Sequence, residues 1–527
     1  MRRIVTDAGA ARRADAVAVG ALLAAVPVVH RIGPALDAPY WLDESWVALA
    51  AKAPLVDLPW VTASTPLGWT LLVWSVPGGG QLQRLIPLLF LAGSVLAGYA
   101  FGRFLGWPGR GWAVAAGLSA GAATLLIPAQ VVRHDLKQYT AEGAVALLLP
   151  AMTAWLESAW SRRRLVLVGA GVVAGMLFSH PAALIGAAVL GALLLTSAVG
   201  GRRGRLRDTA LVSAGTAVAA LLVYVVLDRP NRNVALADYW SGFFPTVGGL
   251  PSYLGNRLAE LTPALGAPWQ LVAAAAAVGV VAVARLGRPA TALALLLVPV
   301  IAVAAALAGV YPLLDQRTSH FLLVVAAAVA GTGLVRTAAD LTGHLPAQTR
   351  ARTRTRSAVA AVLVVTAMSA YAMANSRVLL HPPAPGDPGE DVRAQVAYVA
   401  SHRRPDDVIA VNMSGQFGFA YYWSEDPPLL RRGGPMATGW HVSYADGSRI
   451  LVASGRDTAA VADLVATAER LAGAGGRIWL VRSHVNADER AAWHAALAGG
   501  VVDEIAVGPE PLATLTVLQT PGHRTGR

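Results

Sequence analysis

The stretch Tyr40-Trp41-Leu42-Asp43-Glu44-Ser45-Trp46 carries two adjacent carboxylates between aromatic side chains, directly after an apolar segment. That segment, roughly residues 14–32, is long enough to cross a bilayer, which takes about 20 residues. Carboxylates at a membrane surface are costly to desolvate and contribute little to packing. The pair therefore either has a chemical role, or is simply solvated or caps the next helix. These residues alone leave the interpretations open.

The composition of the whole chain agrees with a membrane location. Of its 527 residues, 55% are hydrophobic and only 14% are charged, and the mean hydropathy is +0.51. These values predict an integral membrane protein. No small-residue cleavage pattern follows the first apolar segment, so we expect a retained span rather than a signal peptide. The absence of cysteine excludes disulfides and thiolate metal sites.

Apolar runs predict about 11 membrane-spanning helices, with boundaries good to a few residues. The runs lie at about residues 14–32, 88–105, 112–127, 141–157, 165–178, 182–199, 210–227, 269–284, 290–310, 321–335 and 358–374.

Arginines gather in alternate connections between these runs, which the positive-inside rule places in the cytoplasm. They are Arg2, Arg3, Arg12, Arg13, Arg103, Arg110, Arg162, Arg163, Arg164, Arg202, Arg203, Arg205, Arg207, Arg285, Arg288, Arg336, Arg350, Arg352, Arg354 and Arg356. Much of the net charge of +12 is therefore a topology signal, which argues against a nucleic-acid partner. With the N-terminus inside and an odd number of spans, the C-terminus is predicted to lie outside.

Residues 376–527 have the composition of a soluble domain, whereas residues 1–375 form the predicted transmembrane domain. We expect an α/β fold in the tail, with a helix capped by Asp457 and another capped by Asn486. Strands are predicted at residues 408–411, 449–453, 477–481 and 512–518. The linker contains Pro382, Pro383, Pro385 and Pro388. The tail has neither a Gly-rich phosphate loop nor a nucleophile elbow, which favours support or acceptor docking over catalysis.

The predicted outer segment at residues 132–142 contains Arg133, Lys137 and Tyr139. If it is helical, Arg133, Lys137 and Thr140 share one face. Cations on the outer side are unusual under the positive-inside rule, so they need a partner. A lipid phosphate or diphosphate is a suitable one. The alternative is an interfacial helix whose cations snorkel to the membrane surface.

The predicted outer turn at residues 310–320 presents a similar choice. Arg317 either contacts a phosphate or simply pairs with Asp315 beside it. Residues 64–74 are too short to span, so we expect an interfacial or re-entrant helix there.

Five elements occur in a fixed order on one predicted side of the membrane. They are Asp43-Glu44, Thr65-Pro66-Leu67-Gly68-Trp69, Arg84-Leu85-Ile86-Pro87, Lys137 with Tyr139, and Tyr311-Pro312 with Arg317. In this order the chain resembles the GT-C glycosyltransferases, in the branch of protein O-mannosyltransferases, lipid A aminoarabinose transferases and rhizobial lipopolysaccharide glycosyltransferases. The family's His-Pro-Pro-Leu-Tyr has Thr65 and Leu67 in place of its histidine and second proline, which leaves acceptor contacts there open.

The resemblance implies a polytopic α-helical GT-C-like membrane protein with a C-terminal extracytoplasmic α/β domain. It also implies a polyprenyl-phosphate-linked sugar donor and an extracytoplasmic acceptor: a cell-envelope glycan, a lipid or a protein. A bacterial plasma membrane is the expected location, because the Ala, Val, Gly and Arg content suggests a high-GC bacterium.

The chemistry of the residues agrees with this implication. Asp43 can act as general base, with Glu44 orienting the acceptor or tuning its neighbour. The cations and a hydroxyl can stabilise the leaving phosphate; these donor-phosphate candidates are Arg133, Lys137, Tyr139 and Arg317. No cofactor is required by the pattern, although the acidic pair could help to bind a divalent metal. The main alternative is a transporter or flippase for a lipid-linked substrate, which would usually carry polar residues at the bilayer midplane.

Overall fold

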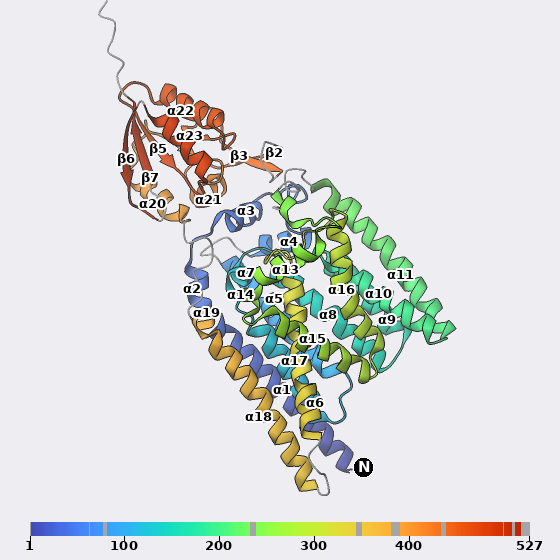
Figure 1. Cartoon of the computed structure of the whole chain (residues 1–527). Helices are drawn as coiled ribbons and strands as arrows, with labels where there is room; N and C mark the ends of the chain where they lie inside the picture. The colour runs from blue at the N-terminus through green and yellow to red at the C-terminus, as the bar shows by residue number, and fades with distance from the viewer. Residues whose placement is uncertain are drawn as a thin grey trace, which may run out of the picture. The chain divides into compact units, whose positions relative to one another are not determined.

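The fold is given by a computed structural model that describes residues 2–62, 64–76, 82–231, 239–343, 350–380, 390–433, 439–498, 500–508 and 512–517. The chain divides into two compact units (Figure 1). We call the first the helical unit, which comprises Met1–Ala35, Arg84–Arg229 and Tyr239–Pro383. The second, the mixed unit, comprises Leu36–Gln83, Pro230–Asp238 and Ala384–Arg527. Each unit is described by itself.

The helical unit is built mainly from long apolar helices. Its main helices are α1 (Arg2–Val29), α5 (Leu85–Phe104), α6 (Arg110–Leu125), α8 (Tyr139–Ser158), α9 (Arg162–Met176), α10 (Ala182–Val199), α11 (Arg203–Val223), α15 (Trp269–Arg285), α16 (Pro289–Leu307), α17 (His320–Gly343) and α18 (Arg350–Ala374). Shorter helices lie at α2 (Ile32–Asp37), which crosses the unit boundary, α7 (Gln130–His134), α13 (Leu250–Glu260), α14 (Thr262–Leu265) and α19 (Ser376–Leu380).

Each of the apolar runs predicted from the sequence lies on one of these main helices. Within the described ranges, five helical segments are long and apolar enough to cross a membrane. They are Leu82–Phe104, Ala182–Val199, Arg203–Asp228, Pro289–Leu307 and His320–Thr342. Two shorter apolar helices cover Trp269–Arg285 and Val359–Ala374. The helical character of the runs is confirmed, whereas the number of about 11 spans stays a prediction.

Small residues allow the central helices to pack closely. A Cβ at Gly102 of α5 would stand 2.3 Å from the carbonyl oxygen of Ala116 of α6, so glycine is required at that approach. A Cβ at Gly279 of α15 would likewise stand 2.2 Å from the carbonyl oxygen of Val329 of α17. Helices α9, α10 and α11 pack on one another and form one side of the bundle (Figure 1).

The mixed unit contains a five-stranded sheet with helices on both faces. Its strands are β1 (Val408–Val411), β4 (Ile450–Val452), β5 (Arg477–Val481), β6 (Val501–Ile505) and β7 (Leu512–Thr516), in the order β4-β1-β5-β7-β6. β1 is parallel to both neighbours, with Ile409 opposite Ile450 and Trp479, whereas β7 is antiparallel to β5 and β6. The continuous apolar sequence of β1 suits a strand that is buried on both faces.

Helices α22 (Thr458–Ala472) and α23 (Ala487–Leu497) cover one face of the sheet, and α20 (Val392–His402) and α21 (Gln416–Tyr422) cover the other. A separate hairpin joins β2 (Leu429–Arg432) and β3 (Trp440–Ser443). The mixed unit also includes two helices from the first half of the chain, α3 (Leu42–Ala50) and α4 (Leu67–Ser75).

The elements predicted for the tail are present. The Asp457 carboxylate accepts from the backbone N–H of Ala460, and the Asn486 side chain accepts from that of Glu489, so both predicted caps are confirmed. Five elements of this unit that the sequence pattern did not indicate are α20, α21, β2, β3 and β6. The short helix expected at residues 64–74 is α4, whereas the linker prolines lie outside the described residues.

Candidate functional site

The acidic pair lies in the first turn of α3 in the mixed unit. Asp43 is half-buried, whereas Glu44 is fully buried, at 0% exposure. Acidic residues are favourable in a first turn because they face the positive end of the helix dipole. The N-cap residue is Trp41, whose side chain makes no capping hydrogen bond, so the pair does not cap the helix in the ordinary way.

The N-terminus of α3 is instead capped from far along the chain. The carboxylate of Glu390 accepts a hydrogen bond of 2.8 Å from the backbone N–H of Leu42. Its other oxygen accepts from the imidazole Nδ1 of His484, and the Glu390 side chain is almost fully buried. A carboxylate at a helix N-terminus satisfies an open donor and is stabilised by the dipole. The backbone that carries Asp43 is therefore anchored one residue away.

Further contacts within the mixed unit hold the rest of α3. The ring of Trp46 stacks on Phe417 of α21, with ring centroids 6.0 Å apart. Beyond the helix, the Lys52 ammonium donates to the carbonyl of Tyr421 at 2.7 Å and lies over its ring. Before it, the backbone N–H of Tyr40 donates to the hydroxyl of Tyr422 at 2.8 Å. These contacts order α3 through side chains more than 300 positions later in the chain.

In the helical unit, Arg133 lies in α7 and is fully buried. Its two terminal nitrogens donate to the carbonyls of Leu125 and Thr124, at 2.9 and 2.6 Å. These carbonyls belong to the last turn of α6, where a cation is favoured by the helix dipole. Burial lowers the pKa of the Arg133 guanidinium to about 9. The guanidinium thus serves as the cap of α6.

Residues 132–142 do not form one helix, since α7 ends at His134. Asp135 has an extended backbone, and its carboxylate accepts from the backbone N–H of Lys137 at 3.1 Å, which forms a tight turn before α8 begins at Tyr139. The shared helical face expected for Arg133 and Lys137 is therefore absent. The physical reason is local competition, because an aspartate that bonds the backbone two residues on favours a turn over a helix. Lys137 and Tyr139 are both buried.

The turn before α17 has a similar construction. The Asp315 carboxylate accepts from the backbone N–H groups of Arg317 and Thr318, at 3.0 and 2.9 Å. The guanidinium of Arg317 is half-buried and donates to the hydroxyl of Tyr239 at 3.0 Å. It also lies 6.0 Å from the ring centre of Trp240. Asp315 therefore shapes the turn, and the guanidinium extends toward aromatic side chains.

Buried histidines link the two cation-bearing segments of the helical unit. The Nε of Arg133 lies 3.4 Å from Nε2 of His320, at the start of α17, and His30 bonds His134 at 3.0 Å. Burial lowers the pKa of His134 to about 4, and the nearby Arg84 and Arg133 add to this shift. The sequence pattern did not indicate this cluster, although His30 and His320 lie at the predicted outer ends of apolar runs and His134 lies in a predicted outer connection.

The candidate residues are thus distributed over both units. Asp43 and Glu44 belong to the mixed unit, whereas Arg133, Lys137, Tyr139 and Arg317 belong to the helical unit. Within the helical unit, the Arg133–His320 contact brings the α7 segment to the turn that carries Arg317. Glu390 and His484 were also missed, because no sequence spacing relates them to residues near position 42.

Comparison with known proteins shows the fold. No family model matches the chain, and no curated protein matches its sequence. The structure is similar to ArnT from Cupriavidus metallidurans in the apo state, with a TM-score of 0.52 and 16% identity. It is also similar to ArnT bound to undecaprenyl phosphate, with a TM-score of 0.53 and 16% identity. Both alignments cover 94% of this chain and 97% of ArnT. The chain therefore has the fold of ArnT, a glycosyltransferase of the GT-C kind.

Proposed function

We propose that this protein is a membrane glycosyltransferase that moves a sugar from a polyprenyl-phosphate-linked donor to an extracytoplasmic acceptor. The observation that carries the proposal is the GT-C fold along 94% of the chain, with an acidic pair on an anchored helix. ArnT has been solved with undecaprenyl phosphate bound, which supports a lipid-phosphate donor here. The acceptor is an envelope glycan, a lipid or a protein, and the location is a bacterial plasma membrane with the N-terminus in the cytoplasm.

In this proposal Asp43 is the general base. An acceptor hydroxyl attacks the anomeric carbon of the sugar and loses its proton to the Asp43 carboxylate. The bond from the anomeric carbon to the phosphate oxygen breaks, and its electron pair leaves with the polyprenyl phosphate. A single displacement of this kind inverts the anomeric carbon. The cap by Glu390 anchors the backbone that carries Asp43, whose side chain is half-buried. In this proposal the buried Glu44 orients the acceptor or tunes Asp43.

The leaving phosphate gains negative charge, which Lys137, Tyr139 and Arg317 stabilise in this proposal. Arg317 is the most accessible of the three, since the other two are buried. The guanidinium of Arg133 already bonds two carbonyls, which favours a positioning role through His320 over direct phosphate binding.

The proposal is tested with purified full-length protein and a panel of polyprenyl-phosphate sugars. We expect release of polyprenyl phosphate that depends on an added acceptor, and a loss of release in Asp43→Asn. Chelation and re-addition of Mg²⁺ in the same assay tests whether the acidic pair uses a divalent metal. Movement of an intact lipid-linked sugar across vesicles without release of polyprenyl phosphate would favour a flippase and would contradict the proposal.

A further inference from the structure

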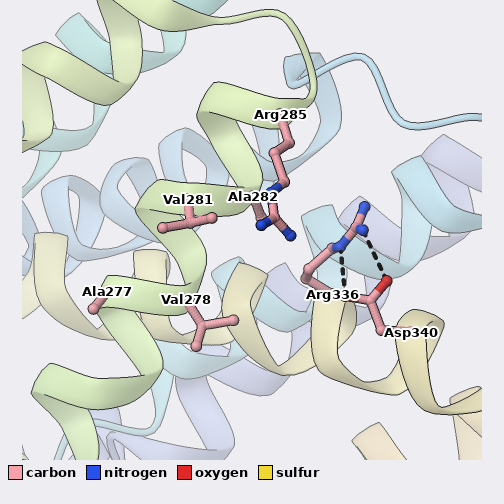
Figure 2. A pocket seen from close by; sticks show the side chains of 7 residues that line it. All are labelled: Ala277, Val278, Val281, Ala282, Arg285, Arg336 and Asp340. Atoms are coloured by element: carbon pink, nitrogen blue, oxygen red, sulfur yellow. Dashed lines mark hydrogen bonds and ion pairs between the residues drawn. The ribbon is translucent and has the colours of Figure 1, made fainter.

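A groove between α15 and α17 has no part in the proposed reaction (Figure 2). Its volume is about 300 Å³. Five of its lining residues come from α15 and two from α17: Ala277, Val278, Val281, Ala282, Arg285, Arg336 and Asp340. Both arginines lie toward the ends of their helices that the positive-inside rule assigns to the cytoplasm.

Helical spacing explains the groove. Positions 277, 278, 281, 282 and 285 recur at intervals of one, three and four, so these α15 side chains share one face of the helix. Alanine at 277 and 282 leaves space that larger side chains would fill. The two helices are held close nearby, because a Cβ at Gly333 of α17 would stand 2.2 Å from the carbonyl oxygen of Ala275.

The polar end of the groove has a net positive charge. Figure 2 shows the guanidinium groups of Arg285 and Arg336 facing one another from the two helices. Asp340 makes two contacts to Arg336, at 2.8 and 2.9 Å, which fixes that guanidinium on its own helix. Two cations and one carboxylate leave one excess positive charge at the mouth. Val278 and Val281 are 41% and 49% exposed, so the wall below the arginines presents apolar surface.

We propose that this groove binds an anionic phospholipid of the surrounding leaflet. The phosphate lies between Arg285 and Arg336, and an acyl chain lies along Val278 and Val281. Charge complementarity selects this occupant: guanidinium groups bind phosphate oxygens through charge-assisted hydrogen bonds, and basic pockets between membrane helices bind acidic head groups. A choline head group carries an additional positive charge toward the arginines and binds less well.

Native mass spectrometry of the full-length protein in detergent tests the proposal, with phosphatidylglycerol or phosphatidylcholine titrated at equal concentration. The wild type should bind one phosphatidylglycerol that is resistant to dissociation, in preference to phosphatidylcholine. The double variant Arg285→Ala/Arg336→Ala should lose about tenfold or more in affinity for it, the effect of removing a charge-assisted contact. Arg163→Ala is the matched control, because Arg163 is an exposed arginine on the same predicted side and outside the groove.

A second variant keeps both charges but closes the apolar wall. Val281→Trp fills the groove at a position that is already exposed, so it should reduce phosphatidylglycerol binding while the fold is retained. Equal retention of phosphatidylglycerol in the wild type, the double variant and Val281→Trp would overturn the proposal. Equal binding of the two lipids by the wild type would overturn it as well.

Discussion

The short helices α3 and α7 both carry charged side chains, but they differ in the contacts that fix them. In α3 a distant side chain bonds the backbone, whereas in α7 the charged side chain itself makes the bonds. The backbone of α3 is capped by Glu390, so its order depends on a residue from the last third of the chain. In α7 the charged side chain itself is used, since Arg133 bonds the last carbonyls of α6. Arg133 is completely buried, whereas Asp43 is only half-buried. The burial of Arg133 therefore indicates a structural role. Asp43, which has an anchored backbone and a more accessible side chain, is the better candidate for chemistry.

The largest expected effect tests the α3 side of this comparison. Asp43→Asn keeps the size of the side chain but removes its ability to accept a proton, so turnover should fall by about two to four orders of magnitude. Release of polyprenyl phosphate measures turnover, and binding of polyprenyl phosphate should change little. Near-normal turnover in a folded Asp43→Asn protein would show that Asp43 is not the general base. The base would then be Glu44 or a group outside the acidic pair.

The next effect concerns the anchor of α3. Glu390→Ala removes the cap, and the resulting shift of Asp43 should lower kcat by about tenfold to a hundredfold, because small misplacements of catalytic groups are costly. KM for the donor should stay near its original value. Glu390→Gln retains an oxygen acceptor for the Leu42 N–H and should recover part of the loss.

The control for that series is Glu425→Ala in the same unit, where Glu425 pairs with Arg403 at the surface. Its kinetics should match those of the wild type. Equal losses of kcat in Glu390→Ala and Glu425→Ala would show that the loss does not come from removal of the cap of α3.

A smaller effect tests the helical unit. Arg317→Ala should weaken donor use by roughly tenfold or more, since a hydrogen bond to a charged group contributes about 1.5–3 kcal/mol. The change should appear in KM for the donor and in kcat/KM. Arg257→Ala serves as the control, because Arg257 pairs with Glu260 on the same helix, α13. An unchanged KM for the donor in Arg317→Ala would show that Arg317 does not bind the donor phosphate.

The smallest expected effect is on stability and tests the structural role of α7. In the folded protein the pKa of His134 is lowered to about 4 from 6.5 by burial, so the unfolded chain binds more protons between these pH values. Acidification from pH 6.5 toward 4 should therefore favour unfolding, by about 1–3 kcal/mol from this residue. Thermal unfolding in detergent at pH 7, 5.5 and 4.5 measures the effect. His134→Gln should show a shallower fall in Tm than the wild type, and an identical fall would contradict the assignment.

Local patterns predicted much of the fold. The apolar runs and the Asp457 and Asn486 caps depend on neighbouring residues, so they could be read directly from the chain. The condition for Arg133 and Lys137 to share a helical face is not met, because the Asp135 turn separates them. Strand β6 was missed since Asp503 and Glu504 make its sequence polar, although it pairs with β7 along five residues.

The sequence by itself determined the membrane class, the helical runs, the α/β tail and the order of the candidate residues, because each depends on local composition and spacing. Only the tertiary structure decided that Glu390 anchors the helix of Asp43, and that Arg133 caps α6 beside His320. The physical reason is that a hydrogen bond between groups 348 positions apart, as for Leu42 and Glu390, depends on the folded path of the chain. No periodicity in the sequence indicates which distant residues the fold brings together.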